Sequence, residues 1–294
     1  CQSKNITNDQ TIPSSRFHLS SLSFIFLALT VLGLEDNKDN PVDVLQVKDL
    51  FIQNYKGPLT AKTFELFRDV EHLELRNNNF TTFHWDFLHA LPNLKTLELA
   101  ENNIKEEVDH NITGCCNKLE IISLVESGLS NVQNHTLKKI GTIKSLKQLT
   151  LNNEEVPILH KNTLVNPNLE RLIITGCHLK NIENDAFSQV PELKILDLGF
   201  NNLMQIKKEY FTSLNKLRAI KLRGNLLDKL TTDMITPLPS LEVLFISYNP
   251  INELNLQGIK KIAPKLRIVE ITAIYLEKIE SGGVELSRYP VLRY

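Results

Sequence analysis

Apolar residues recur along the chain in one pattern, leucine-x-x-leucine-x-leucine-x-x-asparagine-x-leucine, which returns about every 24 residues. Ten copies begin at Val47, Val70, Leu94, Leu119, Leu146, Leu169, Leu193, Leu217, Leu241 and Leu266, and an eleventh is expected to start at Leu292. Apolar residues at alternate places mark one face of a strand, because successive strand side chains point to opposite sides. The pattern therefore predicts one short strand per repeat.

Two further apolar places close each coil. The fourteenth place holds Phe83, Val132, Leu159, Ile182, Ile206, Leu230, Leu254 and Ile279, and the nineteenth holds Leu88, Ile112, Leu137, Leu164, Phe187, Phe211, Ile235, Ile259 and Val284. One coil cannot bury these side chains alone, whereas stacked coils share a continuous core. We therefore expect a single solenoid domain whose strands line the inside of an arc.

The ninth place, at the turn from strand to loop, is asparagine in five repeats: Asn78, Asn102, Asn201, Asn225 and Asn249. This turn leaves main-chain amides and carbonyls without partners in the sheet, and an inward-facing asparagine supplies both donors and an acceptor. We interpret these five residues as a structural spine.

The other repeats depart from asparagine at the ninth place, with Tyr55, Ser127, Glu154, Cys177 and Ile274. Ser127 and Cys177 can each donate one hydrogen bond and are interpreted as weaker versions of the same part. A buried carboxylate is costly unless it is paired or protonated, so we expect a local bulge at Glu154.

This combination of repeat and spine resembles the leucine-rich repeat superfamily, in the subtype of extracellular animal proteins such as Toll-like receptor ectodomains and arthropod secreted or surface immune-type proteins. The resemblance covers roughly residues 47–294. It implies an α/β-type repeat solenoid, a curved horseshoe with a parallel β-sheet on the concave face and irregular, 3₁₀ or short helical segments on the convex face. The ligand stays open, because one framework serves many functions.

An apolar run of thirteen residues, Leu22–Leu34, precedes the repeats. It is shorter than the roughly 20 residues that span a bilayer, but it matches the core of a secretory signal peptide. We interpret residues 1–33 as a leader, 34–46 as a short lead-in and 47–294 as the repeat domain. The start at Cys1 is expected of a partial or mis-started gene sequence. The alternative is that the run forms a buried first coil.

Four acceptor motifs for N-glycosylation begin at Asn5, Asn79, Asn111 and Asn134. Asn5 would be lost with the leader, which leaves the other three as candidate sites. Together with the leader, they favour a secreted protein or one on the extracellular side of the plasma membrane. No membrane anchor is recognised in the sequence.

The four cysteines form no cluster at either end of the repeats, so the cysteine-rich caps that the family resemblance implies are absent or lie outside this sequence. Cys115 occupies a place that is apolar in other repeats and is expected to be a small buried hydrophobe. Cys116 is expected to be more exposed, with an intermolecular disulfide as the alternative. No histidine has ligand spacing to Cys177 or to this pair, so no metal site is expected.

Enzymatic chemistry is not indicated by any motif. The chain lacks the glycine-rich phosphate loops, the His-Glu-x-x-His zinc motif and the Gly-x-Ser-x-Gly nucleophile motif. The formal net charge of -1 argues against a general polyanion-binding protein. We therefore expect no catalytic residues, no cofactor, no small-molecule substrate and no nucleic-acid partner.

Side chains between the strand leucines point into the arc, where a protein ligand would bind. The candidate contact patch consists of Phe200, Arg218, Lys221, Arg223, Phe245 and Tyr248. Aromatic residues and arginine are enriched at interface hot spots, where a buried ring contributes about 2 kcal/mol or more. The alternative is that Phe200 and Tyr248 fold down beside the spine as packing residues, while Asp197 and Lys221 pair on an ordinary solvated face.

Acidic side chains dominate the same face in the early coils: Glu71, Glu74, Glu98, Glu101, Glu120 and Glu126. They either meet a basic partner or form an ordinary solvated surface, and the second interpretation is favoured.

Three functions compete. The first is a secreted or cell-surface recognition protein, of the immune or receptor type, that holds a protein ligand or co-receptor on its concave face. The second is an extracellular matrix or adhesion scaffold, in which formation of homodimers or heterodimers matters more. The third is an intracellular leucine-rich repeat regulator of another protein.

Overall fold

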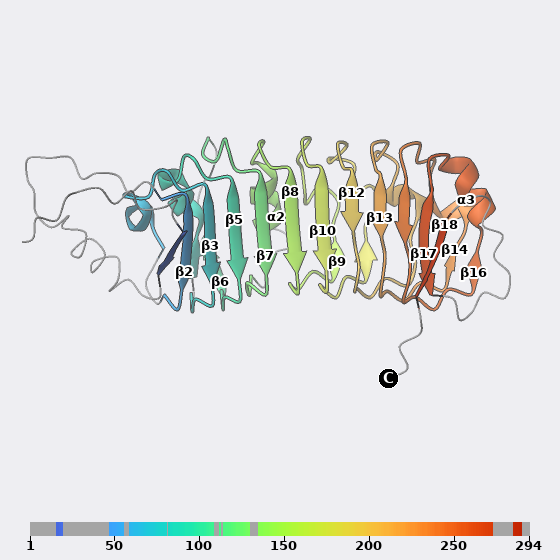
Figure 1. Ribbon diagram of the computed structural model, residues 1–294, viewed down its shortest axis with the longest axis horizontal. Coiled ribbons are helices and arrows are strands. Elements are labelled where there is room, and N and C mark those ends of the chain that lie inside the picture. Colours follow the sequence, from blue (N-terminus) through green and yellow to red (C-terminus); the bar gives the residue numbers. More distant parts are fainter. Residues whose placement is uncertain are drawn as a thin grey trace, which may run out of the picture.

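The computed structural model describes residues 16–19, 47–55, 59–80, 82–108, 112, 114–129, 135–272 and 285–289. A parallel sheet of twelve strands runs the length of this described part (Figure 1). Ten of the strands begin two residues after the predicted repeats do: β2 (Asp49–Gln53), β3 (His72–Arg76), β5 (Thr96–Ala100), β7 (Ile121–Val125), β8 (Gln148–Asn152), β10 (Arg171–Thr175), β12 (Ile195–Asp197), β13 (Ala219–Lys221), β15 (Val243–Phe245) and β17 (Ile268–Thr272). The prediction of one short strand per repeat is confirmed.

The two outermost strands were not predicted. β1 (Arg16–Leu19) pairs with β2, and β18 (Glu285–Tyr289) pairs with β17. Each strand covers main-chain groups that an open sheet edge would leave unpaired. The rest of the expected leader and lead-in lies outside the described residues. So does Leu292, where the eleventh repeat was expected.

Short helices and small sheets form the opposite side of the coils. The helical segments are η1 (Ala61–Phe64), η2 (Trp85–Ala90), α2 (Leu137–Gly141), η4 (Lys208–Tyr210), η5 (Thr232–Met234) and α3 (Leu256–Ile262). The small parallel pairs are β4 (Thr82–His84) with β6 (Glu106–Val108), β9 (Ile158–Leu159) with β11 (Asn181–Ile182), and β14 (Lys229–Leu230) with β16 (Glu253–Leu254). Helical turns need more room than the 4.8 Å or so between strands, so the sheet takes the concave side, as expected.

The core is one continuous layer between the sheet and the convex segments. Strand leucines such as Leu73 and Leu75 are fully buried, and neighbouring strands match them in register, with Leu73 opposite Leu97. At the fourteenth and nineteenth places, every described residue is buried except Leu254, which is half-buried against the core. Val132, Ile279 and Val284 lie outside the described residues.

The five spine asparagines are buried and connect neighbouring coils. The Asn201 amide nitrogen donates to the carbonyl of Ile174 at 2.7 Å, and its Oδ1 accepts from the amide of Cys177 at 3.0 Å. Asn225 repeats the arrangement one coil later, donating to Leu198 O at 2.9 Å and accepting from Leu203 N at 3.0 Å. Each side chain thus satisfies main-chain groups of the coil before its own.

The bulge expected at Glu154 is wrong. β8 pairs residue for residue with β7 and β10, and Glu154 lies in the spine with 3% of its surface exposed. Its Oε1 accepts a hydrogen bond from the main-chain amide of Ser127 at 2.6 Å. The side-chain oxygen of asparagine accepts the equivalent hydrogen bond in other coils. Burial raises the pKa of the Glu154 carboxyl, which favours the uncharged form and removes the need to break the strand.

Cys177 takes the same place one coil later. Its thiol donates to the carbonyls of Leu151 at 3.5 Å and Thr175 at 3.3 Å, and burial raises its pKa to about 11. The expected weaker hydrogen bonding of a thiol matches these long contacts.

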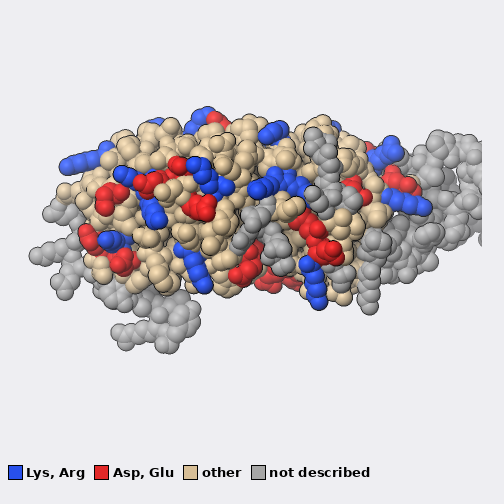
Figure 2. Space-filling view, turned by 180° about the vertical axis from the view of Figure 1, so that it is seen from behind, with Lys and Arg blue, Asp and Glu red and all other residues tan. Residues whose placement is uncertain are grey.

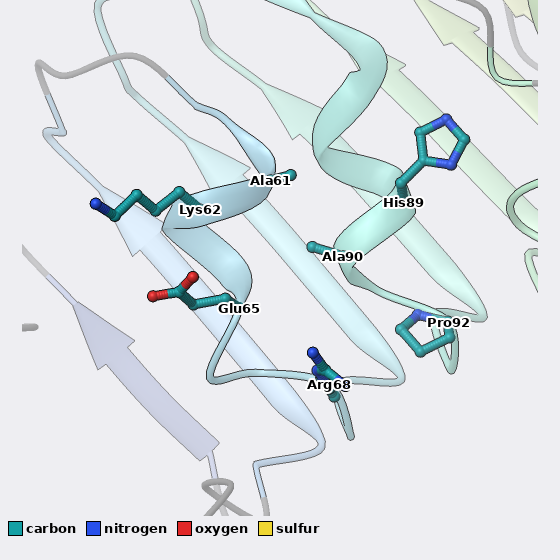
Figure 3. A pocket seen from close by; sticks show the side chains of 7 residues that line it. All are labelled: Ala61, Lys62, Glu65, Arg68, His89, Ala90 and Pro92. Atoms are coloured by element: carbon teal, nitrogen blue, oxygen red, sulfur yellow. The ribbon is translucent and has the colours of Figure 1, made fainter. Parts of the chain in front are cut away.

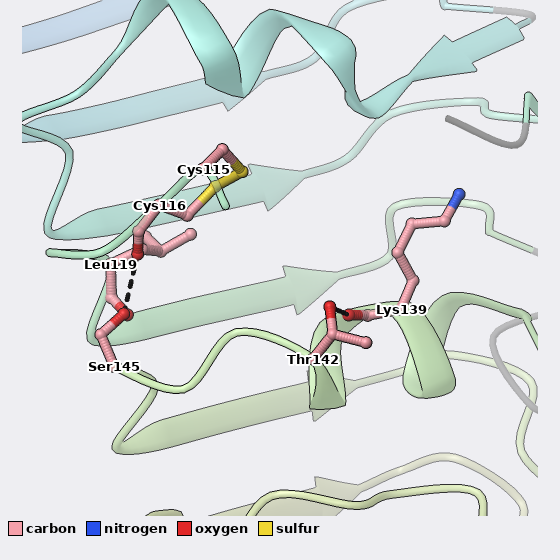
Figure 4. The surroundings of a disulfide bond; sticks show 6 residues. All are labelled: Cys115, Cys116, Leu119, Lys139, Thr142 and Ser145. Carbon is pink, nitrogen blue, oxygen red and sulfur yellow. Dashed lines mark hydrogen bonds between the residues drawn. A yellow bond between two sulfur atoms is a disulfide. The ribbon is translucent and has the colours of Figure 1, made fainter. Parts of the chain in front are cut away.

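The expectations for Cys115 and Cys116 are both wrong, because the two residues form a disulfide with each other and Cys116 is the more buried of the pair (Figure 4). This repeat has one extra residue, so the packing position must be counted back from the next strand. Leu119 N donates to Cys116 O at 3.0 Å, just as Leu94 N donates to Leu91 O at 3.2 Å. Cys116 therefore fills the core place that leucine fills in other coils.

Glu154→Gln is expected to change the pH dependence of stability. The raised pKa stabilises the wild type fully below about pH 4.5, the ordinary value, and this contribution is lost as the pH rises through the folded-state pKa. Glutamine keeps the acceptor and stays neutral. The variant should match the wild type at pH 4 and exceed it in urea midpoint at pH 8. Glu155→Gln, at the exposed neighbour, is the control. A parallel pH dependence in variant and wild type would contradict the assignment.

Candidate protein-binding surface

Three of the six acidic side chains of the early coils, Glu71, Glu74 and Glu101, form ion pairs. Glu71 lies between Lys48 at 2.9 Å and Lys95 at 2.5 Å, and its hydrogen bonds to both lower its pKa to about 2. Arg76 contacts Glu101 at 2.6 Å and Glu74 at 3.8 Å. The arrangement agrees with the favoured interpretation of an ordinary solvated surface.

Phe200 and Tyr248, the aromatic residues at the eighth place, are exposed by 62% and 36%. Both have left-handed backbone angles, with φ of 56° and 58°. The Phe200 ring lies over Gly224 of the next coil, where a Cβ atom would stand 2.7 Å from the ring. Phe200 therefore does not fold down beside the spine.

Arg223 and Phe245 form a fixed internal unit with Glu270. The Arg223 guanidinium donates through Nε and Nη2 to the two carboxylate oxygens of Glu270, and its centre lies 4.7 Å from the centroid of the Phe245 ring. Ser247 donates its hydroxyl to the same buried carboxylate. The unit spans repeats eight, nine and ten, so Arg223 is held in place by the fold.

The two remaining cations of the candidate patch differ. Lys221 pairs with Asp197 at 3.1 Å, as the alternative interpretation proposed. Arg218, which directly precedes the same strand, is exposed. The structure thus keeps Phe200, Tyr248 and Arg218 on the surface and commits Lys221 and Arg223 to neighbouring side chains.

Sequence reasoning missed two exposed apolar residues beside this patch, Met204 and Leu226, which are exposed by 68% and 44%. Leu226 N donates to Leu203 O at 2.9 Å, which places Leu226 next to Met204. The sequence could have revealed them, because the tenth and twelfth places are mostly polar in the other repeats, as at Asn103 and Lys105, and hold no other leucine or methionine.

Phe200, Met204, Leu226 and Tyr248 together are called the apolar edge. They follow the strands of repeats seven to nine. Among the described residues, the one other exposed large apolar side chain is Val165, which lies in repeat five. Exposed apolar surface is therefore concentrated at one end of the solenoid.

The glycosylation candidates belong to repeats two to four of the sequence. Asn79 is exposed at the tenth place of repeat two, whereas Asn111 and Asn134 lie outside the described residues. Thr136, the hydroxyl residue of the motif that begins at Asn134, is buried and donates a hydrogen bond to Glu107. Glu107 also accepts from Trp85 Nε1 at 2.7 Å and lies 3.2 Å from the Lys139 amine, which makes a buried polar cluster that sequence reasoning did not find.

The convex side offers no comparable surface in the described part of the chain. Basic and acidic side chains are interspersed over it (Figure 2). An open cavity of about 540 Å³ lies between η1 and η2, lined by Ala61, Lys62, Glu65, Arg68, His89, Ala90 and Pro92 (Figure 3). Its charged residues are exposed and of both signs, so the cavity does not define a site.

The described residues show neither a metal site nor a membrane-spanning helix. No group of three or more histidine, cysteine, aspartate or glutamate side chains is close enough to hold a metal ion. None of the helices in this part of the chain has the length and apolar character needed to cross a membrane.

Replacing Arg223 should reveal its structural role. Arg223→Ala leaves the Glu270 carboxylate buried without its cation and is expected to lower the free energy of unfolding by about 3 kcal/mol. Arg218→Ala, at an exposed residue of the same strand region, should change it by less than about 0.5 kcal/mol. Urea unfolding measures both variants, and equal small effects would show that the Arg223–Glu270 pair does not hold the last coils together.

The sequence is similar to those of known leucine-rich repeat proteins. The leucine rich repeat family matches residues 54–111, 167–227 and 191–251. The zebrafish (Danio rerio) transforming growth factor beta activator LRRC33 is 28% identical over 210 residues, covering 59% of this chain and 29% of that protein. Probable U2 small nuclear ribonucleoprotein A' of Caenorhabditis elegans is 30% identical over 89 residues, or 30% of this chain and 35% of that protein.

A solved structure, that of the TLR13-ssRNA13 complex, has the same fold. It superposes with a TM-score of 0.62 at 21% identity and covers 77% of this chain and 36% of that one. The chain thus spans about a third of the length of the proteins it matches. With the ten stacked strands and the asparagine spine, these matches identify the chain as a leucine-rich repeat protein whose solenoid resembles Toll-like receptor ectodomains in fold.

Proposed function

We propose that this chain is a non-enzymatic recognition module that acts outside the cell and binds a protein ligand or co-receptor at repeats seven to nine. The observation that carries the proposal is the apolar edge. Soluble monomers rarely gather exposed apolar side chains in one place, and such patches mark binding sites. The two aromatic residues are of a type that dominates binding energy at protein interfaces.

The surroundings of the apolar edge support this role. Lys221 pairs with Asp197, and Arg223 pairs with Glu270, so the neighbouring charges are held in fixed positions. A preorganised surface loses less side-chain entropy on binding. Ion-paired charges also attract a polyanion weakly, so a protein ligand is favoured over the nucleic acid seen with the structural neighbour.

The distribution of glycosylation motifs supports binding at the same end. The motifs at Asn79, Asn111 and Asn134 fall in repeats two to four, and none occurs from residue 137 onward. Carbohydrate attached at these residues would leave repeats five to ten uncovered. The growth-factor activator among the relatives, LRRC33, fits an extracellular role for such a solenoid.

The intracellular alternative rests on the ribonucleoprotein relatives. The second of these, from Schizosaccharomyces pombe, is 32% identical over 83 residues, which is 28% of this chain. These matches cover short stretches, whereas the LRRC33 match extends over 59% of the chain. The extracellular assignment is therefore preferred.

Cellular location separates the two assignments. Expressed from its full-length transcript in insect cells, the protein should enter the medium or reach the cell surface and shift in mobility after glycosidase treatment. Asn79→Gln should remove part of that shift, while Asn103→Gln, an exposed asparagine outside any motif, should not. A protein that stays inside the cell without carbohydrate would refute the extracellular assignment.

The binding surface is tested by charge insertion. The double variant Phe200→Asp with Tyr248→Asp should lose about 30-fold or more in affinity for protein ligands found by screening secreted and cell-surface proteins, which corresponds to about 2 kcal/mol. Val165→Asp, at the exposed apolar residue of repeat five, should bind as the wild type does. Thermal unfolding verifies that all variants fold. Unchanged affinity in the double variant would exclude the apolar edge as the contact.

A further inference from the structure

Second-place residues of the ten repeats form a continuous row along one edge of the sheet. Each main-chain amide in the row donates to the carbonyl of the member before it, from Glu71 N to Lys48 O at 2.8 Å through to Arg267 N to Glu242 O at 2.9 Å. Their side chains therefore lie about one strand spacing, or ~4.8 Å, apart. The row consists of Lys48, Glu71, Lys95, Glu120, Lys147, Glu170, Lys194, Arg218, Glu242 and Arg267.

Charge alternates strictly along this row except at one step. Lys194 is followed by Arg218, so two cations stand side by side. Opposite charges on adjacent strands stabilise a sheet and like charges destabilise it. The other steps each bring together a cation and an anion.

The neighbours of this step are already paired. Lys194 contacts Glu170 at 2.7 Å, and Glu242 contacts Arg267 at 3.3 Å. Arg218 is exposed, and no ion pair or side-chain hydrogen bond reaches it from the described residues. Arg218 therefore makes no ion pair with Glu242, the carboxylate on its other side, and it stands at a place where the alternation of charge calls for an anion.

An aliphatic strip lies directly beside Arg218. The third-place residues of repeats seven to ten pair in register and are half-buried: Ile195, Ala219, Val243 and Ile268. In five of the six earlier repeats the same place is polar: Asp49, His72, Thr96, Gln148 and Arg171. The cation and the apolar strip coincide at one end of the solenoid.

We propose that Arg218 and this strip receive a segment of the protein ligand in which a carboxylate side chain lies next to aliphatic side chains. The inference rests on the proposed function and names the chemistry of the partner. A carboxylate at Arg218 accepts two parallel hydrogen bonds from the guanidinium fork and offsets the repulsion from Lys194. The aliphatic side chains of the ligand cover the strip, and the bulkiest of them packs over the small Ala219.

Selection from a random peptide library displayed on phage tests the proposal without a known ligand. Peptides are kept if they bind the wild-type protein and fail to bind Ala219→Trp, in which a large side chain covers the strip. These peptides should be enriched in aspartate or glutamate beside leucine, isoleucine or valine. Each should lose at least about tenfold in affinity on Arg218→Glu, and selection on that variant should favour lysine or arginine instead.

Lys147→Glu is the matched control, because it reverses an exposed charge in the same row three repeats away. It should change affinity for the selected peptides by less than about twofold. Selected peptides without acidic preference, or with equal affinity for Arg218→Glu, would overturn the proposal while leaving protein recognition intact. If the wild type enriches no peptide at all, both this proposal and the proposed function fail.

Discussion

Hydrogen bonds from the ninth side chain of one coil to the main chain of the coil before it are the constraint on which this fold depends. A coil of about 24 residues turns sharply after its strand, and the turn leaves buried amides and carbonyls that the sheet does not reach. Asn201 and Asn225 supply what is missing for the preceding coil. No coil is complete by itself, so stability is a property of neighbours and is passed along the solenoid.

The same dependence explains why glutamate can take the place of asparagine at residue 154 of the spine. Glu154 replaces asparagine, and its carboxyl still accepts from Ser127 while burial favours its neutral form. The fold tolerates a change of residue type at this place because the geometry of one hydrogen bond is preserved. The expected bulge followed from the cost of a charged carboxylate, and the raised pKa of the buried Glu154 carboxyl lowers that cost because it favours the neutral form.

Contacts within a repeat or between adjacent repeats could be predicted from the sequence, because the leucine period reports directly on strand and core. The ten strands and the core places are of this kind. Contacts that skip a coil, such as Arg223 with Glu270, have no period to reveal them. The cysteine pair was misjudged because the extra residue of its repeat shifted the count, which only the position of the next strand corrects. Met204 and Leu226 are apolar residues at the twelfth and tenth places, which are mostly polar in other repeats. They were missed because the prediction of the contact patch considered only residues in and directly beside the strands.

The backbone at the eighth place has a consequence for how this surface can change. Most repeats have asparagine, glycine or glutamate at the eighth place, and the described residues at this place have positive φ. Glycine and asparagine are the residues least strained in that conformation. Phe200 and Tyr248 adopt it with bulky aromatic side chains, at a conformational cost of about 1 kcal/mol or more each. Replacement of either ring by glycine would relieve that strain, so drift under selection for stability alone would remove both aromatics. Their presence at these two places identifies where the sequence trades stability for an exposed ring.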